Sequence, residues 1–171
     1  MNQFKELFLK INTILGLVFV VGCGGGIEVE EEFQSHYDHF IAEAKRIAPD
    51  KELEFRSIKI KFGPVTPAEG YTEEETLGGC EIRAIRGDGS IYWGDTILIN
   101  SVVWEKLSES QREVVIFHEL GHCLLERTHE DGLIIKDKTR VFESIMNTNI
   151  IDESIYAKDK DYYMSELFLK N

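Results

Sequence analysis

The order of apolar and polar positions along the chain predicts an α+β fold. Apolar residues recur at helical spacing in residues 33–48 and again in the closing stretch 161–170. Residues 57–62 and 80–85 alternate between apolar and polar side chains, as half-buried strands do. Residues 96–99 are continuously apolar, which is typical of an interior strand covered on both faces. We therefore expect a small sheet covered by helices.

The longest expected helix covers residues 109–125. Ser108, followed three positions later by Gln111, has the spacing of a capping box and marks the start of this helix. Apolar side chains lie on several faces of the segment, which predicts a helix that is buried nearly all round. Gly121 in its interior lowers helix stability by about 1 kcal/mol relative to alanine. We therefore expect another segment to pack closely against the helix at this glycine.

The first residues have the pattern of an export signal. Residues 1–22 combine a short basic start with an apolar stretch that is too short to span a bilayer. A small residue then precedes Cys23, which looks like the lipobox of bacterial lipoproteins, and glycines and glutamates follow. We expect residues 1–22 to be a lipoprotein signal peptide and residues 23–32 a tether from a lipidated Cys23. Residues 33–171 would then form one domain, exported and anchored to the cell envelope on its periplasmic or outer side.

The net charge limits the partners that the chain can bind, and its cysteines permit a disulfide. The net charge of −12 over 171 residues repels nucleic acid and anionic lipid headgroups. We therefore expect no nucleic-acid partner and no contact with the membrane except through the anchor. We also expect a monomer. Export permits a disulfide between the two remaining cysteines, Cys80 and Cys123. Two reduced, buried cysteines are the alternative.

One segment, HELGHCLLERTH at residues 118–129, contains three of the five histidines of the chain. His118 and His122 lie one helical turn apart and project from the same side of the expected helix, so both imidazoles can bind one metal ion. Glu119 points elsewhere and is placed to act as the general base toward a metal-activated water. This combination predicts a hydrolase, because the neutral imidazoles can hold the metal and the carboxylate can carry a proton.

His129 can be the third ligand only if the helix ends before it. Seven residues of continuous helix rise roughly 10.5 Å, which is too far for two ligands of one ion. Thr128 and the acidic residues that follow His129 are poor helix formers, so the chain can fold back after Leu124. The carboxylates of Glu130 and Asp131 are the alternatives for the third ligand.

The motif at His118–His122, the later histidine and the downstream sequence SIMN at residues 144–147 together resemble the metzincin clan of zinc metallopeptidases. The usual metzincin spacing is H-E-x-x-H-x-x-G-x-x-H, and this chain departs from it twice. Leu125 stands at the glycine position, and Thr128 stands where the third histidine is expected. The spacing is similar instead to secreted bacterial lipoprotein metallopeptidases that carry H-E-L-G-H-C, a later histidine, a preceding cysteine and a Ser-Ile-Met segment.

This resemblance implies a zincin-like fold and a set of roles. The fold would have a small twisted mixed sheet, an antiparallel edge strand near residues 80–85, a buried active-site helix and a C-terminal helix. Met146 would lie in the Met-turn, the apolar floor beneath one Zn²⁺ ion held by His118, His122 and His129.

An edge strand has free N–H and C=O groups with which an extended peptide can pair. We therefore expect a zinc-dependent endopeptidase with Glu119 as general base. One alternative is a metal-stabilised lipoprotein that binds peptides without cleaving them. Another is a zinc hydrolase that acts on a non-peptide amide.

Overall fold

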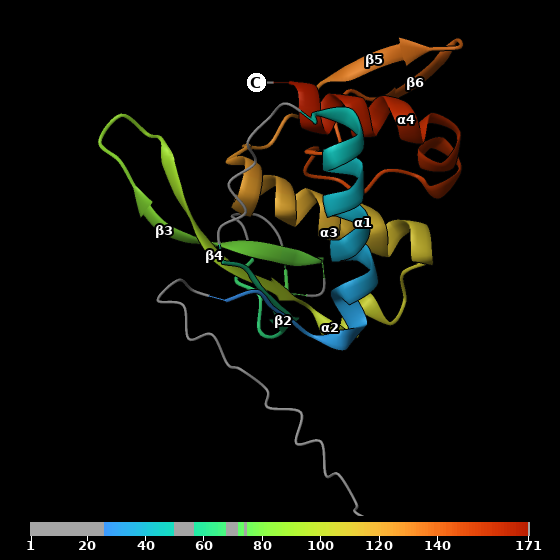
Figure 1. Cartoon of the computed structure of the whole chain (residues 1–171). Helices are drawn as coiled ribbons and strands as arrows, with labels where there is room; N and C mark the ends of the chain where they lie inside the picture. Colours follow the sequence, from blue (N-terminus) through green and yellow to red (C-terminus); the bar gives the residue numbers. More distant parts are fainter. Residues whose placement is uncertain (1–25, 50–56, 68–71, 74, 171) are drawn as a thin grey trace, which may run out of the picture.

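The computed structural model describes residues 26–49, 57–67, 72–73 and 75–170. It confirms the expected α+β fold, with a four-stranded mixed sheet, helices and a separate two-stranded hairpin in these ranges (Figure 1). None of the described helices has the length and apolarity that a bilayer span requires. The expected signal peptide and Cys23 lie outside the described residues.

The sheet has the strand order β1-β2-β4-β3. Strands β1 (Glu28–Val29), β2 (Lys59–Phe62) and β4 (Ile91–Ile99) run parallel to one another. Strand β3 (Gly78–Ile85) runs antiparallel to β4 and forms one edge of the sheet. The antiparallel edge strand near residues 80–85 is thus present, and residues 96–99 lie in an interior strand as expected.

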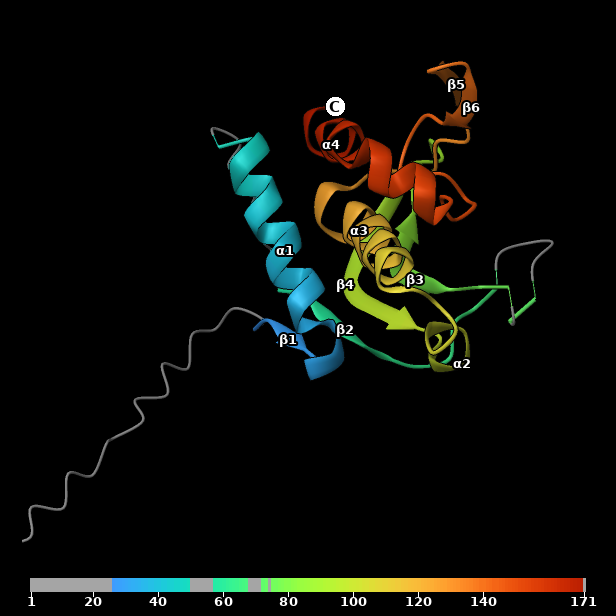
Figure 2. The same cartoon turned by 90° about the vertical axis from the view of Figure 1, so that its right-hand side faces the viewer.

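Helix α3 (Glu109–Leu125) is the central element of the domain. It packs against β3 and β4 on one side and against α1 (Glu31–Ile47) and α4 (Glu153–Leu169) on the other. Figure 2 shows α3 almost end-on, with α1 and α4 around it and the sheet behind. A short helix, α2 (Ser101–Trp104), connects β4 to the start of α3.

Local sequence signals account for the bounds and the burial of α3. The Ser108 Oγ accepts the Gln111 N–H at 3.4 Å, and the Gln111 side chain accepts the Ser108 N–H at 3.0 Å, which completes the expected capping box. The apolar faces of the helix are buried, as its pattern predicts. Three of the largest fully buried side chains among the described residues belong to α3 itself, namely Ile116, Phe117 and Leu120. The others are Phe33, Phe40, Ile58, Ile60, Ile97, Ile99, Tyr156, Tyr163 and Phe168.

The expected boundary between tether and domain is corrected by the structure. Residues 23–32 were expected to be a tether, but Glu28 and Val29 pair with β2, and Glu31 begins α1. The pairing depends on a strand distant in sequence, so composition alone does not reveal it. Acidic residues in the first turn of a helix also interact favourably with the helix dipole, which suits the glutamates at the start of α1.

Two further elements differ from the expectation. Helix α4 begins at Glu153, well before residue 161, and is kinked at Asp159, where φ is −114° and ψ is 21°. The kink interrupts the helical periodicity, and this is why only the second half is visible in the sequence. Strands β5 (Leu133–Lys136) and β6 (Thr139–Phe142) form a small hairpin that was not expected.

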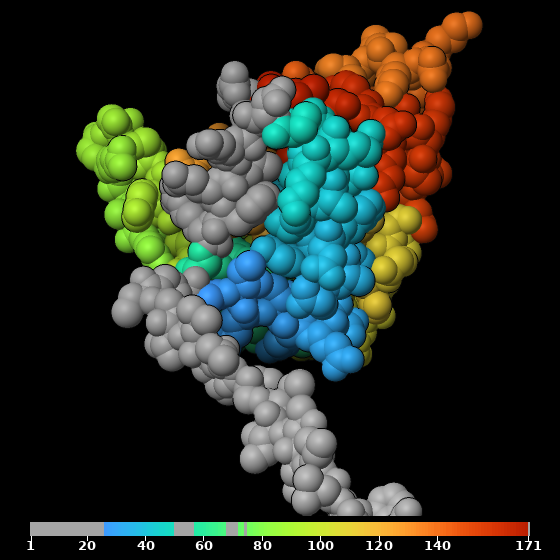
Figure 3. All heavy atoms as spheres, in the orientation of Figure 1, coloured from blue at the N-terminus to red at the C-terminus, as the bar shows by residue number. Residues whose placement is uncertain are grey.

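The outer half of the β3–β4 hairpin projects from the body of the domain (Figure 3). The register between the two strands shifts on both sides of Ile82, as it does at β-bulges, which increase strand twist. Ile82, Ile85 and Tyr92 on this hairpin are 50%, 68% and 41% exposed. The hairpin therefore presents apolar side chains to solvent beside the free edge of β3.

Candidate metal centre

Three imidazoles converge at the C-terminal end of α3. The Nε2 atoms of His118 and His122 are 3.0 Å apart, and each lies 3.2 Å from the Nε2 of His129. Nitrogen ligands at tetrahedral angles around zinc, each roughly 2.0–2.1 Å from the ion, are separated by about 3.3 Å. The three atoms therefore have the spacing of ligands that share one ion.

The hydrogen bonds of two of these histidines leave their Nε2 lone pairs directed at one another. The Nδ1 of His118 lies 2.9 Å from the carbonyl oxygen of Ile145, and the Nδ1 of His122 lies 2.6 Å from that of Arg127. Since a carbonyl only accepts, each Nδ1 carries the proton and each Nε2 is an acceptor. Two acceptors 3.0 Å apart are well placed to share a cation, and the donor set of three imidazoles suits Zn²⁺.

A chain reversal directly after α3 brings His129 to the other two histidines. Glu126 adopts the left-handed conformation, with φ of 56°, and the N–H groups of Glu126 and Arg127 both bond to the carbonyl of Gly121. In this chain Leu125 stands at the glycine position of the usual metzincin spacing. The chain reverses one residue later, at Glu126. The histidine is also one residue late, and the separation between the turn and the third imidazole is therefore the same.

Met146 lies beneath the C-terminal half of α3 and is fully buried. A Cβ atom added at Gly121 would lie 2.5 Å from the Met146 sulfur, so the glycine is required by the close approach of this side chain. The adjacent Ile145 supplies the carbonyl that accepts the His118 Nδ1–H. Ile145 and Met146 thus lie against α3 next to His118 and Gly121, and the Met-turn role that the resemblance implies for Met146 stays a prediction.

Glu119 lies beside the histidines in a buried position and is 6% exposed. Its Oε2 has no hydrogen-bond partner within the described residues. Burial raises the pKa of Glu119 to about 8, and a hydrogen bond from the Cys80 N–H opposes this shift. A Cβ atom at Gly78 would lie 3.3 Å from the Glu119 carboxyl oxygen, so this glycine of β3 leaves room for the carboxyl group.

The edge strand is covalently joined to the helix that carries the motif. A disulfide links Cys80 of β3 to Cys123 of α3, with the two Cα atoms 5.7 Å apart. Cys123 follows His122 directly, and Cys80 donates its N–H to Glu119. The disulfide therefore holds the strand, the general-base candidate and a histidine in one unit.

Burial keeps the imidazoles neutral and ready to bind a metal. It lowers the pKa of His118 to about 4 and the pKa of His122 to about 3, and the neighbouring imidazoles lower both further. It also lowers the pKa of His129, although this side chain is exposed at the mouth of the site. Neutral imidazole is the form that binds a metal ion, so metal binding at neutral pH releases little or no proton from these residues.

Sequence reasoning did not identify several residues that shape the centre. The Trp93 ring of β4 stacks on the His122 ring, with centroids 4.4 Å apart and planes 25° apart. Gly78 opens space for Glu119, and a glycine pair at the start of a strand is the signal that could have indicated close approach. The role of Trp93 depends on tertiary packing and has no local signal.

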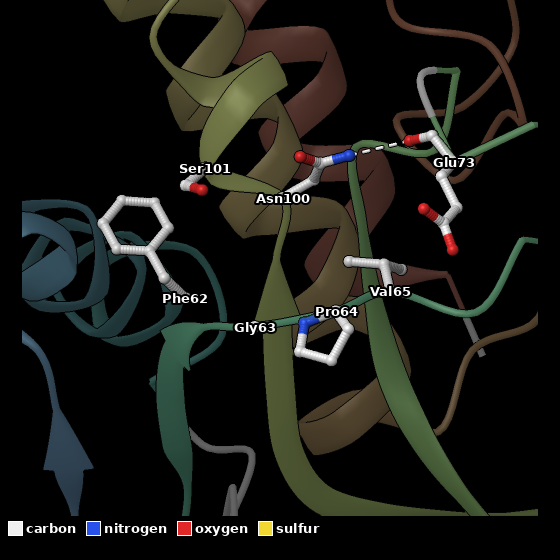
Figure 4. Close-up of a pocket in the computed structure, with 7 residues that line it drawn as sticks. All are labelled: Phe62, Gly63, Pro64, Val65, Glu73, Asn100 and Ser101. Atoms are coloured by element: carbon white, nitrogen blue, oxygen red, sulfur yellow. Dashed lines mark hydrogen bonds between the residues drawn. The ribbon is translucent and has the colours of Figure 1, made fainter.

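A separate pocket of about 380 Å³ lies at the carboxyl ends of β2 and β4 (Figure 4). The Asn100 side chain crosses its upper side and donates to the Glu73 carbonyl at 2.7 Å. None of the three histidines lines this pocket, so it is distinct from the metal centre. Its lining residues are Phe62, Gly63, Pro64, Val65, Glu73, Asn100 and Ser101.

One comparison with known proteins bears on this centre. Residues 94–146 match the model of a family described as "Putative phage metallopeptidase". The chain is similar to metallopeptidases over this segment. The match covers less than half of the chain, but it includes the three histidines, Glu119 and Met146. No curated protein and no solved structure matches the chain. The family match and the histidine cluster together support a metal-dependent peptidase.

Proposed function

We propose that the chain is a zinc-dependent endopeptidase. One observation carries this proposal: three imidazole Nε2 atoms lie 3.0–3.2 Å apart beside a buried carboxyl group with an oxygen that has no partner within the described residues. A closed structural zinc site does not require such a carboxyl group. A hydrolytic site does, because an attacking water must lose a proton.

His118, His122 and His129 would hold the ion. When bound, zinc lowers the pKa of a water molecule, polarises a carbonyl group and lowers the pKa of a nearby carboxyl. In this proposal the Glu119 Oε2 accepts the proton of the attacking water and returns it to the leaving amine, and its lack of a partner within the described residues supports this role. The Cys80 N–H holds the carboxyl group during both transfers.

The substrate in this proposal is an extended peptide that pairs with β3. This strand forms the edge of the sheet, and Gly78 and Cys80 at its start lie directly against Glu119. The Cys80 N–H is already bonded to the Glu119 carboxyl group, so the peptide would pair with the edge beyond Cys80 and extend from there past the carboxyl group and the histidines. Ile82 and Ile85 farther along the strand offer exposed apolar contacts to its side chains.

The test is cleavage of a mixed peptide library by zinc-loaded protein, read by mass spectrometry. We expect internal cleavage that stops when a chelator removes the metal and returns when zinc is added back. Protein that carries one zinc per chain and binds peptides without cutting them would be a peptide-binding lipoprotein instead. Hydrolysis confined to small non-peptide amides would identify the third alternative, and either outcome rejects the endopeptidase.

We also propose that Cys23 carries the lipid anchor. Strand β1 begins at Glu28, five residues after Cys23, and a chain of that length spans at most about 17 Å even when fully extended. The catalytic domain would therefore stay close to the membrane surface, while its net negative charge opposes direct contact with anionic headgroups. We expect Cys23→Ser to move the protein from the membrane fraction to the soluble fraction. Unchanged fractionation rules out the anchor.

A further inference from the structure

A buried carboxylate on α4, Glu166, has two hydrogen-bond partners that belong to different segments below the metal centre. Its side chain is 7% exposed. The Glu166 Oε1 accepts from the Arg127 Nη2 at 2.5 Å, and the Oε2 accepts from the Ser144 hydroxyl at 2.8 Å. Each oxygen therefore has a separate donor, one before and one after the β5–β6 hairpin.

The first donor to Glu166, Arg127, connects this carboxylate to His122; we call this connection the first branch. Arg127 is 8% exposed, and its Nη1 also donates to the carbonyls of Glu166 and Leu167 at 3.1 and 3.3 Å. The guanidinium is thus fixed to the C-terminal end of α4, with a further contact to the Glu130 carboxylate. The backbone carbonyl of Arg127 accepts the His122 Nδ1–H at 2.6 Å. Fixing this side chain fixes the acceptor that orients His122.

The second donor to Glu166, Ser144, connects this carboxylate to His118; we call this connection the second branch. Ser144 is fully buried, donates its hydroxyl to Glu166 and accepts the Met146 N–H at 2.9 Å. Ile145 lies between these two residues, and its carbonyl accepts the His118 Nδ1–H at 2.9 Å. The bond from Ser144 to Glu166 therefore fixes the turn that presents the acceptor for His118.

We infer that Glu166 is a positioning residue for the metal centre, because it aligns through Arg127 and Ser144 the two carbonyls that orient His122 and His118. This inference rests on the proposed metal site. The Nδ1–H hydrogen bond of a ligating histidine sets its tautomer and ring orientation, and loss of such outer partners lowers metal affinity by about 10–100-fold. The carboxylate is suited to this role because both of its oxygens accept, whereas an amide has only one accepting oxygen.

The test compares Glu166→Gln with Tyr163→Phe in the otherwise complete protein. Tyr163 lies one turn earlier on α4, is fully buried and donates its hydroxyl to the Phe142 carbonyl at 3.1 Å. Its substitution removes a buried hydrogen bond of α4 without touching Arg127 or Ser144. Zinc Kd is measured by competition with a chromophoric chelator at a temperature at which circular dichroism shows all proteins folded. We expect the Kd to rise at least about 10-fold in Glu166→Gln and less than about twofold in Tyr163→Phe.

A second readout uses metal-free protein and so separates this inference from the proposed function. Long-range ¹H–¹⁵N spectra of the imidazoles report which ring nitrogen carries the proton. We expect only the Nδ1–H tautomer of His118 and His122 in wild-type protein and in Tyr163→Phe, and a mixture of tautomers in Glu166→Gln. If Glu166→Gln does not fold, Ser144→Ala is the substitute. It removes the bond from Ser144 to Glu166 and a 3.4 Å contact from the Arg127 Nη2, but Arg127 keeps its bonds to Glu166 and Leu167. We therefore expect it to release His118 more than His122.

The outcomes are distinct. Suppose that wild-type protein does not bind zinc, but that its two histidines each show one tautomer and Glu166→Gln shows a mixture. This result rejects the metal site and retains the positioning role of Glu166. Equal zinc Kd and equal tautomers in wild type and Glu166→Gln overturn the positioning role. Equal losses in Glu166→Gln and Tyr163→Phe also overturn it, because they would reflect general destabilisation of α4.

Discussion

Glu119→Gln is expected to abolish peptide cleavage while zinc remains bound. Glutamine has nearly the same shape and can still accept the Cys80 N–H, but it cannot take a proton from water. Loss of a general acid–base group lowers kcat by about 10²–10⁴-fold. The measurement is kcat on a peptide found to be cleaved, together with zinc stoichiometry by elemental analysis of the same sample.

Glu109→Gln is the matched control for this substitution. Glu109 lies in the first turn of the same helix, and its side chain is 76% exposed. We expect this variant to keep wild-type kcat and zinc content. If Glu119→Gln keeps more than about a tenth of the wild-type kcat, another group serves as the base.

The same substitution has a second consequence in metal-free protein. The pKa of Glu119 is about 8 in the folded state, compared with 4.5 for an ordinary glutamate. The folded state therefore binds more protons than the unfolded state between these values. The stability from this group is fully present below pH 4.5 and is lost as pH rises through 8. Glu119→Gln should thus gain stability relative to wild type by at most about 1.4 kcal/mol per pH unit across this window.

Urea unfolding of both metal-free proteins at several pH values measures this difference. The pKa values of His118 and His122 are lowered by burial, so their contribution is present above pH 6.5 and is lost as pH falls toward 4. That dependence is common to both proteins and cancels in the difference between them. A difference in unfolding free energy that stays constant with pH would show that Glu119 is ionised in the folded state.

The sequence predicted those elements whose signals are local. Helix α3 has the expected bounds because a capping box begins it and apolar residues cover its faces. The end at Leu125 also matches, but the conformation that ends the helix could not be predicted, because Glu126 is not a glycine and its positive φ has no signature in the sequence. The start of β4 was missed because residues 91–95 do not alternate regularly between apolar and polar side chains.

The sequence predicted the arrangement of those site residues that lie on the single helix α3. Spacing alone puts His118 and His122 on one face of α3 and Glu119 on another. The partners that contact them come from distant segments: the Ile145 carbonyl bonds to His118, the Trp93 ring stacks on His122, and the Cys80 N–H bonds to Glu119. These contacts depend on how β3, β4 and the segment after β6 pack against α3, and residue spacing within one element carries no information about them.

His129→Ala is expected to remove most zinc from the protein and with it the peptidase activity. The His129 Nε2 lies 3.2 Å from each of the other two Nε2 atoms, so it completes a ligand triangle that two imidazoles cannot form. Loss of an outer partner already costs about 10–100-fold in metal affinity, and we expect loss of a direct ligand to exceed 100-fold. Zinc Kd by chelator competition measures the effect, and circular dichroism verifies that the variant is folded.

Asp131→Asn decides between His129 and a carboxylate as the third ligand. In the structure, the Asp131 carboxylate accepts the Thr148 N–H at 2.9 Å and the Thr148 hydroxyl at 2.7 Å, and the Glu130 carboxylate is bonded to Arg127 and Lys170. Both carboxylates therefore have partners of their own, whereas the His129 Nε2 faces the other imidazoles. We expect Asp131→Asn to change zinc Kd by less than about threefold, since asparagine can still accept from Thr148. The reverse pattern, with zinc retained in His129→Ala and lost in Asp131→Asn, would assign the third ligand to the Asp131 carboxylate. The proximity of the three imidazoles would then not reflect a shared metal ion.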